Sequence, residues 1–584
     1  MTLSGDRRIR LVIAAALIAV AGVHFWIHRP FYWVWMVAAI AFLGSAVAKR
    51  PWIGAIVPAL IALAGVLLYW VYGPLHWAWI ILWVWVVVAI ALLGSATTRR
   101  LRIGAAIILL VLAFIAIHGK LYNQIGSEYE GFQNFWDSGE NLVGAYTIAT
   151  HGVYSINLQN PQPTTRREPL YSLLLAGLWK IFGVIDGKGV QFSWTGGDVD
   201  RLHILNVAII FGIMVVAGYF VFWQTGRVWL SLATVALLLV DGPLIESAHT
   251  LLTEVPAAFV LLLICILLCR ALDRTRSAHW TIALSIGVAC GVLFFIKAVY
   301  LLLIPVAMLA LLFAGPPGIK SRLRATLIMG LSATVIILPW FVRNYVVSGN
   351  PFPADRSAEM IVVRALYDDM SSDEYRYLFV VWTPGAGKVF LPRDRPSAWQ
   401  RTIGEGYDGI ARDAYERILY PYFGQYEALP NGSYEQSVYL ALQKRGMREI
   451  AANLSGYLKL SMAFMYRALF IDDGRALRMV GFAMTRDNNG VGEMADCLSC
   501  ALLINLPRWL MFWFVLGVAT MRRDWAIVGF TLPVVFTVVA YSFLAYTTPR
   551  YMQPVTPSLV VIFALGISNI LGSLQLPSRF KKLE

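Results

Sequence analysis

The feature that most constrains how this chain can fold is its succession of long apolar runs, which are separated by short polar segments. A helix of about 20 apolar residues crosses the hydrocarbon core of a bilayer, and the runs predict about fourteen such helices. Only 14% of the residues are charged, against about 25% in soluble domains, so polar surface is too scarce for a set of soluble domains. We therefore predict an all-α polytopic membrane protein. The predicted spans lie near residues 11–28, 31–48, 52–72, 77–97, 101–118, 204–224, 228–243, 251–270, 279–296, 299–314, 325–342, 501–521, 524–545 and 552–573.

The basic residues between these runs predict the orientation of the chain. Lys and Arg number 48 against 34 Asp and Glu, which leaves a net charge of +14. If the N-terminus is cytoplasmic, nearly all the basic clusters fall in cytoplasmic loops, as the positive-inside rule requires. We interpret the excess charge as a topology signal, and we expect membrane lipids and no nucleic acid as partners. We expect both termini to be cytoplasmic and the membrane to be the inner (plasma) membrane of a bacterium.

Two long polar stretches and one internal repeat divide the chain. The stretches at 119–203 and 343–500 each follow an odd number of predicted spans, so we expect both on the extracytoplasmic side. The repeat matches VAAIAFLGS at 37–45 with VVAIALLGS at 87–95. The predicted parts are an N-terminal accessory four-helix region at 1–100, a transmembrane module at 101–342 that includes the loop 119–203, a mixed α and irregular extracytoplasmic domain at 343–500 with helix-like stretches at 406–420 and 444–468, and C-terminal helices with a basic tail at 501–584.

Five ionisable residues fall together at the predicted extracytoplasmic ends of the spans. Charges in or near the hydrocarbon are costly, so each of them suggests a function. An acid beside several cations suits transfer of a group from a phosphate to a hydroxyl, because the acid can take the proton of the hydroxyl. Lys and Arg would neutralise the departing phosphate, which Arg can bind through two hydrogen bonds. The five residues are Asp137, Glu254, Lys297, Arg343 and Arg550.

Simpler interpretations of the same residues stay open from the sequence. Lys and Arg side chains can snorkel to lipid headgroups, and Arg343 can simply anchor the end of its helix. Glu128, Glu130 and Glu140 lie close to Asp137 and are alternatives to it as the acid of the loop. A solvated acidic face is the ordinary role of such carboxylates.

A series of short motifs resembles one family of membrane enzymes. The loop that begins FWDSGENLVGAYTIATHGVYS contains Asp137, then the triplet Gly152-Val153-Tyr154, and then an R-x-P-x-Y element at Arg167, Pro169 and Tyr171. The later motifs are Arg201 with Asn206, LLTEVP around Glu254, LPWFVRN at 338–344 and PRYMQPVTP at 549–557. In this order they resemble the GT-C membrane glycosyltransferases, in particular the aminoarabinose-transferase-like and protein O-mannosyltransferase-like group. The resemblance covers about residues 120–350 and 500–570.

The resemblance implies a GT-C-like fold and an inverting sugar transfer, which needs one base and no covalent intermediate. The implied donor is a polyprenyl-phosphate sugar, and the implied acceptor is a hydroxyl group of a glycan, a lipid or a protein. The roles that the resemblance implies are general base for Asp137, second acid for Glu254, donor-phosphate binding for Lys297, Arg343 and Arg550, and lining of the substrate cavity for Arg167, Glu168, Tyr171 and Arg201.

The sequence leaves the cofactor and two rival functions open. No pattern requires a cofactor or a metal, because the His residues show no metal-ligand spacing. Some members of the GT-C group use a divalent metal, and the pair Glu128 and Glu130 leaves open the alternative of a bound metal. A transporter or flippase of an anionic lipid or solute would use the same cations for translocation, although a repeat relating two halves of the bundle is lacking. The remaining alternative is an assembly protein with a degenerate site, and Cys497 and Cys500 can form a local disulfide.

Overall fold

The structure is a computed structural model, and the chain divides into two compact units, Met1–Gln124 and Ile125–Glu584. The residues that it describes are 136–181, 197–248, 250–273, 280–352, 355–367, 418–429, 434–471, 505–544 and 549–574, with Leu110, Phe114, Ser372, Tyr375, Leu378, Phe379 and Trp382. The predicted N-terminal region 1–100, Glu128, Glu130, Cys497 and Cys500 lie outside these residues. What the sequence predicts for them therefore stays a prediction.

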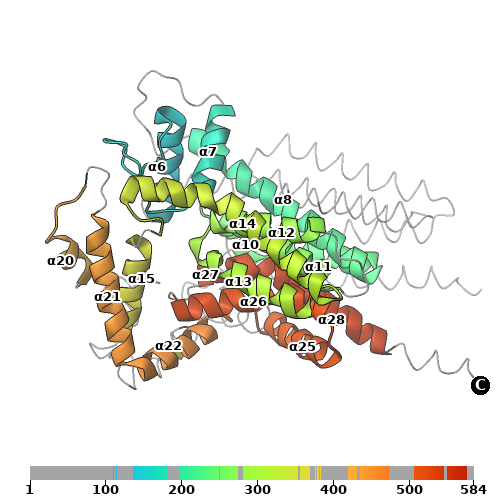
Figure 1. Ribbon diagram of the computed structural model, residues 1–584. Helices are drawn as coiled ribbons and strands as arrows, with labels where there is room; N and C mark the ends of the chain where they lie inside the picture. The colour runs from blue at the N-terminus through green and yellow to red at the C-terminus, as the bar shows by residue number, and fades with distance from the viewer. Residues whose placement is uncertain are drawn as a thin grey trace, which may run out of the picture. The chain divides into compact units, whose positions relative to one another are not determined.

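Every regular element within the described ranges is a helix (Figure 1). In chain order these are α6 (Trp136–His151), α7 (Leu170–Ile181), α8 (Gly197–Thr225), α9 (Val228–Leu239), α10 (Gly242–Ala248), α11 (Glu254–Leu272), α12 (Trp280–Phe294), η3 (Ala298–Leu302), α13 (Leu303–Ala314), α14 (Ile319–Ser348), α15 (Asp355–Tyr367), α20 (Tyr420–Phe423), α21 (Gln436–Ala452), α22 (Leu454–Arg467), α25 (Leu506–Arg522), α26 (Trp525–Leu544), α27 (Pro549–Met552), η6 (Gln553–Val555) and α28 (Thr556–Leu574).

Five helical stretches of the described residues are long and apolar enough to cross a membrane. They are Leu202–Thr225 within α8, α11, α14, α26, and Arg550–Leu571 across α27, η6 and α28. Each coincides with a predicted span, so the prediction of a helical membrane protein is confirmed in this coarse form. The apolar helices α9, α12 and Ala298–Ala314 also coincide with predicted spans but are shorter. The total of about fourteen spans stays a prediction.

The first predicted polar loop, 119–203, contains more regular structure than its composition suggested. It holds α6, α7 and the beginning of α8. Helix α7 is apolar, but its 12 residues give a length of about 18 Å, well short of the hydrocarbon core. It packs instead against α6, with Leu142, Leu175 and Trp179 buried between them. This packing fixes the position of α6, which carries Asp137 at its beginning.

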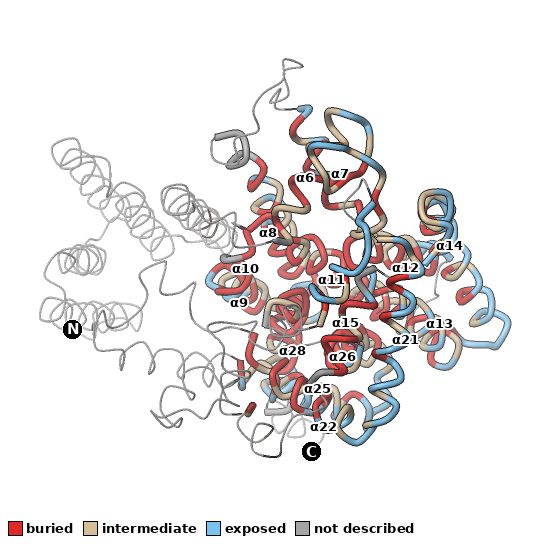
Figure 2. Tube along the Cα trace, turned by 90° about the vertical axis from the view of Figure 1, so that its left-hand side faces the viewer, coloured by how far each residue is buried: buried red, intermediate tan, exposed pale blue. Residues whose placement is uncertain are grey.

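Helix α11 lies at the centre of the bundle and packs against α8, α12 and α26. Its sequence is apolar on all sides, as expected for a helix surrounded by other helices. Figure 2 shows α11, α26 and α28 among the buried segments. Gly529 of α26 faces the backbone of Leu268, where a Cβ atom would be crowded, so the absence of a side chain allows the close approach. This central packing leaves Glu254 at the N-terminal end of a helix that is largely enclosed by its neighbours.

A second group of helices, α15, α20, α21 and α22, has its own apolar core and is called the helical domain below. Ala358, Val362, Leu442 and Phe464 are buried in that core. The predicted helical stretch 444–468 is confirmed, with a break at Asn453 between α21 and α22. The Asn453 side chain caps α22 by accepting a hydrogen bond from the Gly456 amide at 3.1 Å. Most of the other predicted stretch, 406–420, lies outside the described residues.

Candidate active site

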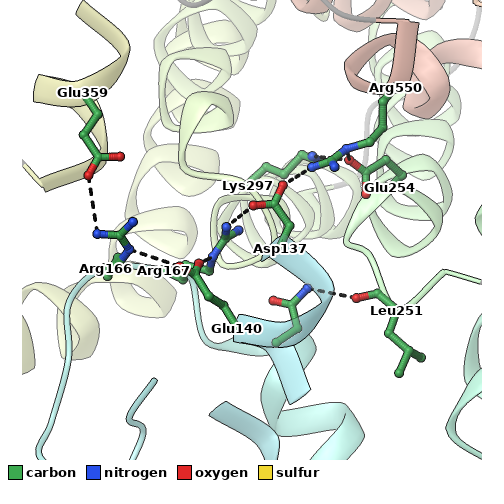
Figure 3. A network of polar contacts seen from close by, with 10 residues as sticks. Asp137, Glu140, Arg166, Arg167, Leu251, Glu254, Lys297, Glu359 and Arg550 are labelled. Carbon is green, nitrogen blue, oxygen red and sulfur yellow. Dashed lines mark hydrogen bonds and ion pairs between the residues drawn. The ribbon is translucent and has the colours of Figure 1, made fainter. Parts of the chain in front are cut away.

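Four ionisable side chains from four separate elements meet at one end of the apolar helices (Figure 3). Asp137 lies in the first turn of α6, and Glu254 is the first residue of α11. Lys297 precedes η3, and Arg550 lies in α27. The two acids stand at helix N-termini, where the exposed amide groups and the helix dipole favour negative charge. Local helix boundaries therefore place both acids, and the bundle packing brings them to the cations.

Arg550 joins the two acids. Its Nε donates to Glu254 Oε1 at 3.0 Å, and its Nη2 pairs with Asp137 Oδ2. Lys297 Nζ also donates to Glu254 Oε1, at 3.1 Å. Glu254 is only 1% exposed and Lys297 only 9%, so each charge depends on its partners for stabilisation. The other carboxylate oxygen, Glu254 Oε2, is buried and has no hydrogen-bond partner among the described residues.

The contacts continue from Asp137 into the polar segment between α6 and α7. Arg167 Nη2 pairs with Asp137 Oδ1, and Arg167 Nε pairs with Glu140 Oε2. Arg166 Nε donates to Glu140 Oε1 at 3.2 Å, and Arg166 Nη1 donates to Glu359 Oε1 of α15 at 3.4 Å. Acids and bases alternate through the whole series, which we call the acid–base network. Its members in order are Glu359, Arg166, Glu140, Arg167, Asp137, Arg550, Glu254 and Lys297.

The backbone that carries Arg166 and Arg167 is fastened at both ends. We call residues 164–170 the strap. Arg343 Nη1 donates to the Thr164 carbonyl at 2.6 Å. At the other end, Glu168 Oε1 accepts the Ala298 amide at 2.7 Å, and the Leu170 amide donates to Phe295 O at 3.2 Å. The strap therefore joins α14 to the turn that carries Lys297.

Tyr154 adds a further support to the strap. Burial raises the pKa of the Tyr154 hydroxyl, so this group keeps its proton and can donate. It donates to the Glu168 carbonyl at 3.4 Å, and the Thr164 amide donates to Tyr154 O at 3.0 Å. The Gly152-Val153-Tyr154 triplet thus supports the backbone of the R-x-P-x-Y element.

The structure brings together five of the residues that the sequence analysis selected: Asp137, Glu254, Lys297, Arg550 and Arg167. Arg343 lies apart from them, stacked over the Trp340 ring at 4.6 Å and bonded to the strap. Tyr171 is fully buried and donates to Asn206 Oδ1 at 3.1 Å, which makes it a core residue of α7. Glu168 faces the Ala298 amide. Arg201 lies in α8, and its side chain is outside the described set.

Three members of the network were not selected from the sequence. Glu140 stood only as an alternative to Asp137, although its spacing of three residues places both on one face of α6. Arg166 could have been found from the sequence, because it directly precedes Arg167 of the R-x-P-x-Y element. Glu359 had none, because its contact with Arg166 joins residues 193 positions apart.

The acids of the network are held by cations, and no group of three or more His, Cys, Asp or Glu residues that could hold a metal ion occurs in the described part of the chain. Comparison with protein-family models, with curated proteins and with solved structures finds no match to this chain.

Proposed function

We propose that this protein is a membrane glycosyltransferase that moves a sugar from a polyprenyl-phosphate donor to a hydroxyl acceptor on the extracytoplasmic face. The observation that carries the proposal is the meeting of Asp137 and Glu254 with Arg550 and Lys297 at one end of the apolar helices. The resemblance of the surrounding motifs to GT-C enzymes supports the same reaction.

The proposed step is a single displacement with inversion. The acceptor oxygen forms a bond to the anomeric carbon while the bond from that carbon to the phosphate oxygen breaks. The acceptor proton passes to Asp137, and the phosphate leaves with the bonding electrons. Lys297 and Arg550 neutralise that phosphate, and the donation of separate Arg550 nitrogens to two acids keeps its plane oriented.

The position of the site suits a donor with a lipid tail. The long helix α14 exposes an apolar row that includes Leu327, Leu331 and Val335, which suits contact with lipid. A phosphate attached to a polyprenyl tail would lie where the apolar helices end, at the level of Glu254 and Arg550. The donor phosphate could then bind to Lys297 and Arg550 without any of these charges entering the hydrocarbon.

A transfer assay tests the proposal. The purified protein is reconstituted in liposomes with polyprenyl-phosphate sugars and candidate hydroxyl acceptors, and Asp137→Asn is compared with wild type. Loss of a general base lowers the rate by about 10²- to 10⁴-fold. Asp524→Asn is the matched control, because Asp524 is an exposed carboxylate between α25 and α26.

Equal transfer by wild type and Asp137→Asn, with the control unchanged, would contradict the role of Asp137. Absence of transfer with every donor, together with movement of an anionic lipid or solute across the liposome membrane, would favour a transporter or flippase.

A further inference from the structure

Arg166 connects two parts of the molecule that are distant in sequence. Its Nε donates to Glu140 of α6, and its Nη1 donates to Glu359 of α15. The first acid belongs to the segment that carries Asp137, and the second belongs to the helical domain. One guanidinium thus joins the candidate base to a region that contributes none of the proposed reacting groups.

Glu359 is fixed within the helical domain. It is 3% exposed, and its neighbours Ala358, Val362 and Val363 lie in the core of that domain. The domain is also attached elsewhere, because α22 packs on α26 and the Tyr457 hydroxyl donates to Phe543 O. A shift of α15 therefore acts on Arg166 directly, while the α26 attachment holds the other side of the domain.

The effect of such a shift passes through Glu140 to the candidate base. Glu140 accepts from two arginines, because its Oε1 pairs with Arg166 and its Oε2 pairs with Arg167. Arg167 in turn occupies Asp137 Oδ1, while Arg550 occupies Oδ2. Each oxygen of Asp137 thus faces a guanidinium group, and an acceptor hydroxyl reaches Oδ1 more easily once Arg167 has moved away from it. Arg550 also holds the buried Glu254, so Arg167 is the partner that can leave at lower cost.

We propose that Glu359 and Arg166 are positioning residues through which the helical domain keeps Arg167 on Asp137 and so limits the access of water to the base. The inference rests on the proposed function for its catalytic consequence. Because Arg167 covers Asp137 Oδ1, loss of the contact between Glu359 and Arg166 would open the base to water before an acceptor is bound.

The test uses two variants of the contact and one matched control in the full-length protein. Glu359→Gln removes the charge with little change of shape. Arg166→Lys keeps the charge but cannot reach both acids through separate nitrogens. The control is Glu449→Gln, because Glu449 pairs with Arg445 at 2.9 Å on the exposed surface of the same domain. The double variant, Glu359→Gln with Arg166→Lys, shows whether the two residues act through one contact.

The first readout does not depend on catalysis. Hydrogen exchange of a peptide covering the strap reports the Thr164 and Leu170 amides, which are both hydrogen-bonded. We expect exchange to be about three- to tenfold faster in Glu359→Gln and Arg166→Lys, and no faster in the double variant than in the faster single one. The control keeps the wild-type rate. Unchanged exchange in both single variants overturns the proposal.

The second readout is hydrolysis of the polyprenyl-phosphate sugar without acceptor, in which water replaces the acceptor hydroxyl. A base released too early raises this hydrolysis several-fold while transfer to the acceptor falls, whereas general loss of structure lowers both. A parallel fall of both rates in Glu359→Gln and Arg166→Lys contradicts the inference. If the wild-type protein transfers no sugar, the proposed function fails, and the exchange measurement still decides whether Glu359 positions the strap.

Discussion

The acid–base network has two halves, one on each side of Arg550. The membrane half consists of Glu254 and Lys297, and the strap half consists of Glu359, Arg166, Glu140, Arg167 and Asp137. The two halves use the same kinds of residue in different surroundings. In the membrane half, the side chains of Glu254 and Lys297 are 1% and 10% exposed. In the strap half, those of Arg166 and Arg167 are 22% and 13% exposed. A charge that loses its partner in the first half stays buried, whereas Arg166 and Glu140 in the second half can reach water; Glu359, at the end of that half, is buried in the helical domain. Loss of a contact should therefore cost stability in the membrane half and positioning in the strap half.

Removal of one charge from the membrane half should have the largest effect. Lys297→Met takes one cation from the buried Glu254, which keeps its pairing with Arg550. We expect the free energy of unfolding to fall by about 3 kcal/mol. Chemical denaturation in detergent measures it. Lys297→Met with Glu254→Gln should recover part of the loss, and a single-variant loss below about 0.5 kcal/mol would remove the distinction between the halves.

Arg550 joins the halves, so a conservative change there tests whether the network works as a unit. Arg550→Lys keeps the charge, but one ammonium group cannot replace the separate contacts of Nε and Nη2 with Glu254 and Asp137. We expect kcat for sugar transfer to fall about 10²-fold, since the leaving phosphate loses an oriented partner. Arg445→Lys, on the exposed surface of α21, is the control. Comparable kcat in both variants would exclude an oriented role for the guanidinium.

For Arg343 the sequence implies donor-phosphate binding, whereas the structure shows support of the strap. Because its Nη1 holds the Thr164 carbonyl, we expect Arg343→Lys to speed hydrogen exchange of the strap about threefold and to change the donor KM by less than about threefold. The measurements are peptide exchange and donor titration. A donor KM raised more than about tenfold with an unchanged strap would support direct phosphate binding, as the sequence predicts.

Salt should give the smallest effect and act on one half only. Raising the salt concentration from about 0.1 M to about 1 M shortens the screening length from about 10 Å to about 3 Å. The partly exposed strap pairs should weaken, with strap exchange about twofold faster. The stability difference between wild type and Lys297→Met should change by less than about 0.5 kcal/mol between the two salt concentrations, because the buried pair is little screened. Equal salt sensitivity of both measurements would show that water reaches both halves alike.

Local sequence patterns were sufficient to predict the apolar helices and that several charges meet at their ends. The apolar runs that form α8, α11, α14 and α26 are each visible within a window of about 20 residues. Glu254 and Lys297 stand at the ends of such runs, and counting the runs places them on one face. For this reason the amino-acid sequence alone groups Asp137, Glu254, Lys297, Arg343 and Arg550.

The tertiary structure decided which charges touch. Arg343 was grouped with the phosphate-binding candidates, yet it bonds to the strap, and Glu359 reaches Arg166 across 193 positions. Hydropathy is summed over neighbouring residues, so the sequence by itself determines the apolar helices and which charges stand at their ends. An ion pair depends on side-chain tips meeting within about 3 Å, and the packing of distant helices alone sets that distance.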